Sequence, residues 1–435
     1  MRVVLVAPGF PTSLDDHHKP FLLDHARALT GAGAEVTVVC PAHPDAPSRH
    51  VVDGIEVRRV RFAPRRIEAR VALGESYRVF SGLSALWVVP MIARLTLVAA
   101  PQARRRSGDG AAVHGHWWFP CGLVAVAAAT LAGRRVSSVV HIHGSDAAVT
   151  TNAVHRWLAR RVLRRAGAVL TVSEDLRDWA SSLVQRRHGR LPRSRADDTD
   201  AARPRTRLRA LRPLPDTERA VRPSVPLLQV VSMPVGTDRL GPSSPVPPNG
   251  PVVAVGRLMA EKGFDVLIEA VAQMDADQRP EVVIVGDGSN RALLEALALR
   301  RGVNVEFAGA VPPGDIGDWY RRARLVCVPS RREGFGMITA EALAAGRPVV
   351  ATAVGAAPQF ITDGVNGCLA PPDNAEALSA ALTKALRTDL DAGSSTSAVA
   401  PAPFGPEAHA AALLRIYASV IATISSGSVG EARTS

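Results

Sequence analysis

Two glutamates separated by a glycine-rich turn are the first residues in the sequence that could do chemistry. Glu333 and Glu341 lie eight positions apart, and Gly334 and Gly336 allow the backbone to turn tightly beside a ligand. An apolar run predicts a strand directly before this turn, and the pattern after it predicts a helix over about 335–345. The N–H groups at the start of such a helix bind anions. The alternative is a helix with acidic caps, worth only about 1 kcal/mol of stability.

A second candidate binding loop carries two cations. Arg257 and Lys262 lie in the segment GRLMAEKG, directly after a predicted strand at 252–255. Only three of the 52 Lys and Arg residues are lysine, so a lysine is more informative here than an arginine. A guanidinium and an ammonium at the carboxyl end of a strand suit a diphosphate. We interpret this loop as a ligand contact rather than a solvated basic turn, because it shares a strand edge with the two glutamates.

Both loops belong to an alternation of strands and helices that fills the two halves of the chain. Near the start, a buried strand is followed by a helical pattern that ends at two glycines and by a second strand. Strands are predicted at 3–7, 36–40, 138–142, 168–172, 252–255, 282–285, 303–307, 325–328 and 349–351. Such alternation predicts an α/β fold with two doubly wound, Rossmann-like domains facing a cleft.

The domain boundaries follow from shifts in composition. Residues 186–222 hold twelve Arg against five acidic residues with little apolar periodicity, so we expect a poorly ordered insertion there. The predicted parts are an N-terminal Rossmann-like domain (1–185), this insertion (186–222), an interdomain linker (223–250), a C-terminal Rossmann-like domain (251–400), a last helix that packs back on the N-terminal domain (401–425) and a loose tail (426–435).

The two loops together resemble a known family. Glu333 and Glu341, with seven residues between them, resemble the EX7E motif of retaining GT-B glycosyltransferases, and EGFGMITAEALAAGRPVVAT looks like the family-4 branch. The segment GRLMAEKG matches the donor-diphosphate loop of that branch, and VGDG at 285–288 matches its next strand end. These motifs cover about residues 250–385.

The N-terminal half resembles the same family more loosely. FPTSLDDHHKPFLLDHARALTGAGAEVTVVCP looks like its opening βαβ unit, HGHWWFPCG like its H-x-H-W loop, and VHIHGSD like its HGSD segment. VSE at 172–174 and MPVGTD at 233–238 look like later landmarks. Gly9 is the only glycine of the first loop, and Lys19-Pro20-Phe21 stands where many members have G-x-F.

The resemblance implies a role for each matched residue. His143 would lie near the anomeric carbon and the acceptor, and Glu333 would hold hydroxyls of the donor sugar. The residues that would bind the nucleotide sugar are Gly9, Arg257, Lys262, Gly334, Phe335, Gly336, Met337, Ile338 and Glu341. Among them Glu341 would bind the ribose, the two cations the diphosphate, and the N–H groups at 336–338 the distal phosphate. No metal and no other cofactor is expected, because the two cations supply the charge.

Four histidines alternate along two predicted strands. His114 and His116 share one strand face, as do His141 and His143, and two such pairs could bind zinc. No suitably spaced cysteine and no HExxH motif supports zinc, so we expect His141 to be a core residue and His143 to lie at a strand end. The tryptophans at 117–118 are expected to form pocket wall or core.

The charge is distributed unevenly. The net charge of +12 divides into +9 on residues 1–185, +7 on 186–222 and −4 on 223–435. Aromatic residues make up only 4%, which disfavours stacking on single-stranded nucleic acid, and no nucleic-acid partner is expected. A basic N-terminal half instead suggests an anionic acceptor or peripheral contact with anionic lipid.

The expected location is the cytoplasm, with peripheral contact at the inner face of the membrane. Four cysteines without a CxxC motif are typical of free thiols in a reducing compartment. The apolar stretch at 83–100 contains Pro90 and Arg94, so we expect a core or membrane-surface helix rather than a membrane span.

Missing motifs exclude several enzyme classes. The chain has no GxxxxGK[ST] motif of P-loop ATPases, no GxGxxG in the first βα turn and no GxSxG elbow of hydrolases. The resemblance implies that residues 1–185 bind the acceptor and residues 251–400 the nucleotide sugar. It further implies retaining transfer of a hexose from a UDP- or GDP-sugar to a hydroxyl of a glycan, a glycolipid or a secondary metabolite, as in polysaccharide biosynthesis. The alternatives are a GT-B sugar-nucleotide epimerase and a non-catalytic basic protein that binds a membrane or nucleic acid.

Overall fold

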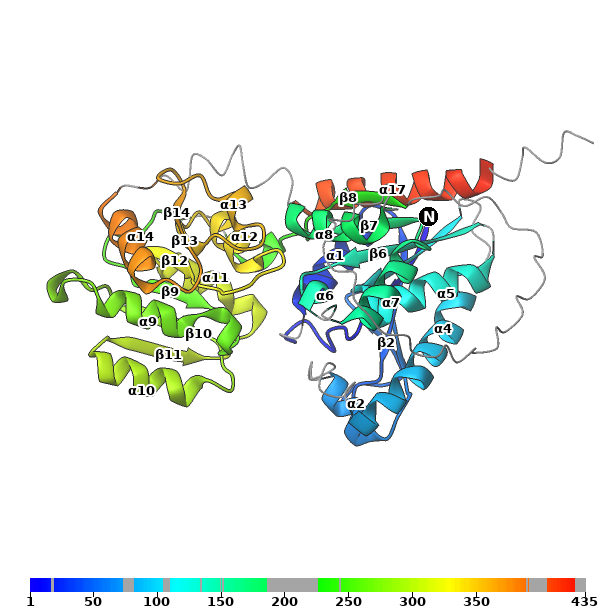
Figure 1. Cartoon of the computed structure of the whole chain (residues 1–435), viewed down its shortest axis with the longest axis horizontal. Helices are drawn as coiled ribbons and strands as arrows, with labels where there is room; N and C mark the ends of the chain where they lie inside the picture. The colour runs from blue at the N-terminus through cyan, green and yellow to red at the C-terminus, as the bar shows by residue number, and fades with distance from the viewer. Residues whose placement is uncertain are drawn as a thin grey trace, which may run out of the picture.

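The chain folds into two α/β domains that lie side by side (Figure 1). The computed structural model describes residues 1–16, 19–72, 82–104, 110–133, 135–148, 150, 152–185, 226–241, 244–388, 390 and 405–426. The insertion predicted at 186–222 lies outside these residues, as does the predicted tail after residue 426.

The N-terminal domain is built on an eight-stranded sheet with the order β3-β4-β2-β1-β5-β6-β7-β8. All neighbouring strands are parallel except β3 and β4. Its strands are β1 (Arg2–Val6), β2 (Glu35–Pro41), β3 (Arg49–Val52), β4 (Ile55–Val60), β5 (Ala111–His116), β6 (Val136–Ile142), β7 (Ala168–Thr171) and β8 (Leu227–Val230). The residues of β5, β6 and β7 are buried throughout, because helices cover both faces of a parallel sheet.

The edge strand β8 lies within the segment predicted as interdomain linker. Its residues Leu227–Val230 pair in parallel with β7 from Ala168 to Thr171. The apolar run LLQV is too short to predict a strand from the sequence alone. It becomes a strand of the sheet because it pairs with β7.

Helices cover this sheet, and the last helix of the chain is one of them. The helices are α1 (Pro20–Gly31), α2 (Arg65–Ala72), α4 (Val88–Arg104), α5 (Leu123–Ala132), α6 (Ser145–Ala148), α7 (Ala153–Leu163), α8 (Glu174–Val184) and α17 (Pro406–Ser426). Although α17 follows the C-terminal domain in the sequence, it packs against α1, β5 and β6 (Figure 1).

By length and composition, two helices among the described residues could cross a membrane. They are Ala85–Arg104 and Pro406–Ile424, and they include α4 and most of α17. Both pack within the N-terminal domain, α4 against α5, β1 and β2, and α17 as described above. Their apolar composition is therefore accounted for, at least in part, by burial in this domain.

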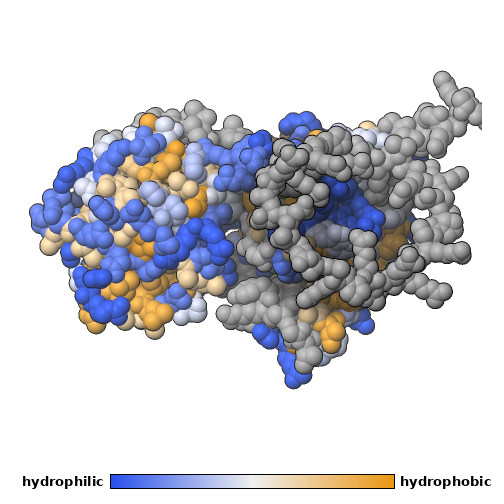
Figure 2. Space-filling model, in the orientation of Figure 1, coloured by the Kyte–Doolittle hydropathy of each residue, from blue (hydrophilic) through white to orange (hydrophobic). Residues whose placement is uncertain are grey.

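The C-terminal domain is built on a six-stranded parallel sheet with the order β11-β10-β9-β12-β13-β14. Its strands are β9 (Val252–Val255), β10 (Val282–Val285), β11 (Val305–Gly309), β12 (Leu325–Val328), β13 (Val349–Thr352) and β14 (Gly367–Ala370). Its helices are α9 (Phe264–Ala272), α10 (Arg291–Arg301), α11 (Ile316–Arg322), α12 (Met337–Ala344), α13 (Ala357–Phe360) and α14 (Ala375–Arg387). On the face shown in Figure 2, hydrophilic residues cover much of this domain and apolar residues are interspersed among them.

Two doubly wound domains with parallel sheets confirm the predicted fold class. In such sheets the loops that follow the carboxyl ends of the strands form the ligand site. One apolar cluster contains residues of both domains, among them Trp118 and Val140 from the first and Tyr320 and Phe335 from the second. The two domains therefore share buried surface next to these loops.

Candidate active site between the two domains

The two domains meet at a pair of glycines, one after β6 and one after β12. A Cβ atom on Gly334 would lie 1.9 Å from the carbonyl oxygen of His143, and one on Gly144 would lie 2.6 Å from the Cα atom of Gly334. Only residues without a side chain allow these two backbones to approach so closely. The contact places His143 and Glu333, the two predicted catalytic residues, on adjoining segments of different domains.

Glu333 is held by the lysine of the other C-terminal loop. The Lys262 ammonium donates to Oε1 of Glu333 at 2.6 Å, and the Ser330 hydroxyl donates to the same oxygen at 2.7 Å. Lys262 ends the short 3-10 helix Ala260–Lys262 that follows β9. The side chains of Lys262 and Glu333 are 21% and 14% exposed, so both remain within reach of a ligand. The structure thus brings together the two motifs that were identified separately in the sequence.

A third cation reaches this region from the N-terminal domain. Lys19 adopts a left-handed backbone conformation at the start of α1, and a Cβ atom on Gly9 would lie 3.3 Å from the Lys19 Nζ atom. Burial lowers the pKa of Lys19, and the nearby Arg257 guanidinium lowers it further. Arg257 belongs to the C-terminal loop, so one cation from each domain faces the other. Lys19 was not among the predicted site residues, although the scarcity of lysine that singled out Lys262 applies to it equally.

Glu341 lies inside α12 and is buried. Its Oε1 accepts a hydrogen bond from Arg239 Nη2 at 2.8 Å, and its Oε2 accepts one from the Tyr320 hydroxyl at 3.0 Å. Arg239 also donates through Nη1 to Oδ2 of Asp24 on α1 at 2.6 Å, so this guanidinium links the two domains. Burial raises the pKa of Asp24, and Arg239 opposes that rise.

Both oxygens of Glu341 therefore have partners within the protein. A carboxylate offers about four acceptor positions, so a ribose hydroxyl would share these oxygens with Arg239 and Tyr320. Sequence reasoning missed both partners. Arginine is too common in this chain for a single one to stand out, and the tyrosine lies in an ordinary amphipathic helix.

The turn before α12 presents backbone rather than side chains. Gly336 has a φ of 86° and directly precedes the helix, which begins at Met337, two residues later than predicted. The first N–H groups of a helix have no acceptor within it, which leaves those at Met337 and Ile338 available to an anion. Phe335 is 5% exposed, and its ring packs edge-on against Phe360 with centroids 5.0 Å apart. The side chain of Phe335 is thus part of the core, and only its backbone lies along the turn.

A buried carboxylate shapes the loop that carries His143. Asp146 accepts hydrogen bonds from the backbone N–H of His143 at 2.6 Å and of Trp118 at 2.7 Å. Burial raises the pKa of Asp146 to about 6, although these backbone donors lower it. The carboxylate therefore fixes the ends of two neighbouring strands, β5 and β6, relative to each other.

His143 itself is enclosed by aromatic rings. Its ring centroid lies 4.5 Å from that of Trp117 and 5.8 Å from that of Phe21, and its Nε2 lies 2.9 Å from Nδ1 of His116. Burial lowers the pKa of His143 to about 3, so the imidazole is neutral at pH 7. Trp118, which follows Trp117 in the sequence, is 1% exposed and belongs to the core.

Family models match both halves of the chain. Residues 19–192 match the model described as glycosyl transferase 4-like domain, and residues 246–395 match the model described as glycosyl transferases group 1. The chain is 40% identical over 146 residues to a D-inositol 3-phosphate glycosyltransferase of Kribbella flavida, which covers 30% of this chain and 34% of that protein. It is 38% identical over 194 residues to the enzyme of the same name from Xylanimonas cellulosilytica, which covers 42% of this chain and 44% of that protein. The matched segments thus span less than half the length of these curated relatives.

Solved structures share the whole two-domain architecture. The sucrose-phosphate synthase of Thermosynechococcus elongatus superposes with a TM-score of 0.65 at 18% identity, over 97% of this chain and 99% of that one. The HepE protein of Anabaena, crystallised in complex with UDP, superposes with a TM-score of 0.63 at 19% identity, over 96% of this chain and 100% of that one. At these identities the likeness concerns the fold alone.

Proposed function

The chain belongs to the GT-B glycosyltransferases of family 4, and on this premise we propose that it transfers a hexose from a nucleoside diphosphate sugar to an acceptor hydroxyl with retention of anomeric configuration. The observation that carries the proposal is the set of cations at the domain junction. Lys262 of the C-terminal domain bonds to Glu333, directly before the turn that precedes α12. Arg257 of the same domain lies near enough to Lys19 of the N-terminal domain to lower its pKa.

This arrangement suits the departure of a nucleoside diphosphate. As the bond between the sugar and the diphosphate breaks, negative charge grows on the leaving oxygen and positive charge on the sugar. Fixed cations and helix N–H groups stabilise the leaving diphosphate without reorganising during the reaction. In the proposal Glu333 holds hydroxyls of the donor sugar, and neutral His143 lies at its reacting face. The donor is a UDP- or GDP-sugar, and a solved structure of the same fold contains UDP.

The acceptor is proposed to be anionic. Residues 1–185 carry a net charge of +9, whereas residues 223–435 carry −4. Two curated relatives are named for an inositol phosphate acceptor, which is an anionic polyol. We expect turnover with a phosphorylated polyol such as D-inositol 3-phosphate to exceed turnover with unphosphorylated inositol. Equal rates with the phosphorylated and the unphosphorylated polyol would refute the proposal that the acceptor is anionic.

Peripheral contact with a membrane completes the proposal. Leu86, just before α4, is 72% exposed, and Val89 and Leu97, at the start and in the middle of α4, are 72% and 66% exposed. All three belong to the basic domain. Exposed apolar side chains on a basic domain suit the surface of an anionic bilayer. Greater recovery on anionic than on neutral vesicles is expected in co-sedimentation, and equal recovery would refute this part.

The experiment for the donor site is a thermal-shift panel of UDP, GDP and ADP with their sugars. A bound nucleotide stabilises the chain by RT ln(1 + [L]/Kd). Lys262→Ala should abolish the shift, whereas Lys384→Ala should leave it unchanged, because Lys384 lies on α14 and pairs only with Asp363 at the surface among the described residues. A panel without any shift, or shifts that survive Lys262→Ala, would overturn the donor assignment.

The reaction itself is tested by product analysis. NMR of the product should show the anomeric configuration of the donor sugar transferred to the acceptor. Conversion of the donor sugar without any acceptor would identify an epimerase instead. Salt-dependent binding to nucleic acid or vesicles with no nucleotide-sugar turnover would identify a non-catalytic binding protein.

A further inference from the structure

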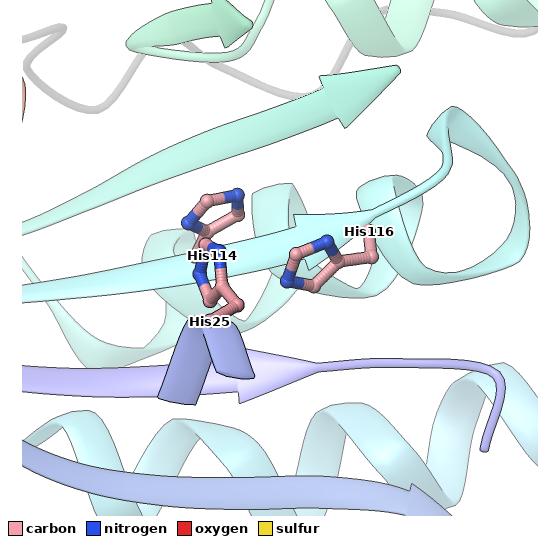
Figure 3. Close-up of side chains that lie close together, drawn as sticks. All are labelled: His25, His114 and His116. Carbon is pink, nitrogen blue, oxygen red and sulfur yellow. The ribbon is translucent and has the colours of Figure 1, made fainter. Parts of the chain in front are cut away.

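Six of the chain's 12 histidines gather beneath the candidate active site. They come from α1, β5, β6 with the residue after it, and α17, and they are His25, His114, His116, His141, His143 and His409. The ring centroid of His25 lies 4.7 Å from that of His116 and 5.1 Å from that of His114. Figure 3 shows His114 and His116 projecting from one strand and the ring of His25, from the adjacent helix, facing them.

Four of these rings have a buried nitrogen without a hydrogen-bond partner among the described residues. Three of these atoms are Nε2 of His25, His114 and His116, and the fourth is Nδ1 of His141. In the first three rings the other nitrogen, Nδ1, is engaged. It faces Nε2 of His409 at 2.9 Å in His25, the Tyr417 hydroxyl at 2.5 Å in His114, and Nε2 of His143 at 2.9 Å in His116.

The hydrogen-bond chain through α17 fixes the tautomer of His25. Nδ1 of His409 lies 2.8 Å from the carbonyl oxygen of Ser232, which can only accept, so this Nδ1 carries a proton. A neutral His409 then has a lone pair on Nε2 and must accept from Nδ1 of His25. The Nε2 atom of a neutral His25 is consequently an unprotonated acceptor, and in the described part of the chain it meets no donor.

A packed cluster of neutral histidines is the plain alternative. It would leave four buried nitrogens unsatisfied, each at a cost of about 1–3 kcal/mol. Buried polar atoms of side chains have partners in the large majority of cases, so four such atoms in one cluster call for an explanation. A cation bound to three of them supplies one.

We propose that Nε2 of His25, His114 and His116 bind one Zn²⁺ ion. The potential ligand atoms of these residues all lie within 4.8 Å of one another. Zinc takes imidazole nitrogens at about 2.0–2.1 Å, and three histidines with one open position for water form a known coordination set. Ligating histidines almost always donate their other ring N–H to a second group, which is the role that His409, Tyr417 and His143 fill here.

A second group of histidines is the competing site. His116, His141 and His143 also bring potential ligand atoms within 4.8 Å of one another. In that group Nδ1 of His116 and Nε2 of His143 already bond to each other. It offers two buried nitrogens without a partner among the described residues, Nε2 of His116 and Nδ1 of His141, against three in the His25 group. The His25 group uses only nitrogens that have none.

The bound ion would have a structural role and would take no part in the transfer reaction. It would join α1, which directly follows Lys19, to β5, and through Tyr417 and His409 it would hold α17 on the same domain. With its Nε2 on the metal, His116 must donate from Nδ1 to His143, which sets the tautomer of His143 with the proton on Nδ1. The site therefore supports the acceptor side of the cleft without touching the donor.

Zinc binding by the full, tag-free chain tests the proposal. The chain is stripped with a chelator, dialysed and titrated with Zn²⁺ in competition with a chromophoric chelator. One equivalent of zinc per chain and a rise in melting temperature are expected, together with tetrahedral visible absorption bands after Co²⁺ substitution. A folded chain that takes up no zinc in this competition would overturn the proposal.

Variants separate the two histidine groups. His25→Gln should weaken zinc binding by at least about tenfold, since it removes one of three ligands. His141→Gln should retain it, and so should the matched control His155→Gln on α7, outside the cluster. Loss of binding in His141→Gln with retention in His25→Gln would assign the site to the other group and refute the proposal.

X-ray absorption of the zinc-loaded wild-type chain gives a measurement that needs no variant. Three imidazole nitrogens in the first coordination shell are expected. A shell that contains sulfur, or fewer than three imidazoles, would contradict the assignment even if His25→Gln fails to fold. None of these measurements depends on glycosyl transfer. A negative result would therefore refute the zinc site without bearing on the proposed function.

Discussion

Replacement of Gly334 by alanine tests whether the closed contact between the domains is needed for turnover. The added methyl group would lie 1.9 Å from the carbonyl oxygen of His143, 2.8 Å from its carbonyl carbon and 3.2 Å from Cα of Gly144. All three are backbone atoms, so no rotation of a side chain relieves the clash. The domains must separate at this point for the variant to fold.

The size of the effect follows from these distances. Real Cβ atoms essentially never approach other atoms closer than 3.0 Å, so the two segments must move apart by at least 1.1 Å, the difference between 3.0 and 1.9 Å. A misplacement of about 1 Å at reacting groups lowers the rate by about 100-fold. We therefore expect kcat/KM to fall by about 100-fold, which is about 2.7 kcal/mol of lost transition-state stabilisation.

The assay measures release of the nucleoside diphosphate from the donor identified in the thermal-shift panel. Binding of the nucleoside diphosphate alone should weaken by no more than about tenfold in Gly334→Ala, because Lys262 and the start of α12 belong to one domain and only the contribution of Lys19 depends on the closed contact. Gly314→Ala is the matched control, since a Cβ atom there meets nothing within 4 Å. Wild-type turnover by Gly334→Ala, or an equal loss in Gly314→Ala, would refute the reasoning.

Three further substitutions test other parts of the site. Lys19→Met should weaken nucleoside diphosphate binding by about tenfold in calorimetry, the worth of one charged hydrogen bond, and Lys384→Met should not; equal affinities would remove Lys19 from the donor site. Arg239→Met leaves two buried carboxylates without their charge partner and should lower the free energy of unfolding by about 3–5 kcal/mol in urea, and an unchanged midpoint would contradict this. Burial raises the pKa of Asp146 from 3.8 to about 6, so between these pH values the unfolded chain releases this proton first and the native state loses stability as pH rises. Asp146→Asn should lack this slope when urea unfolding is measured across the same pH window, and parallel curves for the two proteins would show that Asp146 does not titrate there.

The strands were the most predictable part of the molecule. The apolar runs at 252–255, 282–285 and 325–328 coincide with β9, β10 and β12, because strands buried on both faces have continuous apolar sequences with polar or glycine residues at their ends. The loops after these strands were predictable for the same reason. Once the strands are placed, the carboxyl edge of the sheet brings Lys262 and Glu333 together.

The contacts between distant segments were not predictable. Arg239 bonds to Asp24, 215 positions away in the sequence, and to Glu341, 102 positions away. The sequence around these three residues contains no pattern that predicts the contacts. The histidines show the same limit. The alternation along the strands indicated His114 and His116. The ring that faces them is His25 on α1, and the hydrogen-bond partner of His25 is His409 on α17, 384 positions away. Two pairs on strands gave no reason to prefer zinc, whereas three neighbouring rings whose buried Nε2 atoms have no hydrogen-bond partner among the described residues do.

The charge at the domain junction links donor binding to domain closure. The donor domain contributes Arg257 and Lys262, and the other domain contributes Lys19, whose pKa is lowered by burial and by Arg257. Two like charges this close to each other repel, so the closed contact is less favourable without an anion between them. A nucleoside diphosphate at this place would turn the repulsion into attraction from both sides. Domain closure should therefore tighten when the diphosphate binds, and Lys19→Met should weaken that coupling, because it removes the only one of the three cations that crosses from the opposite domain.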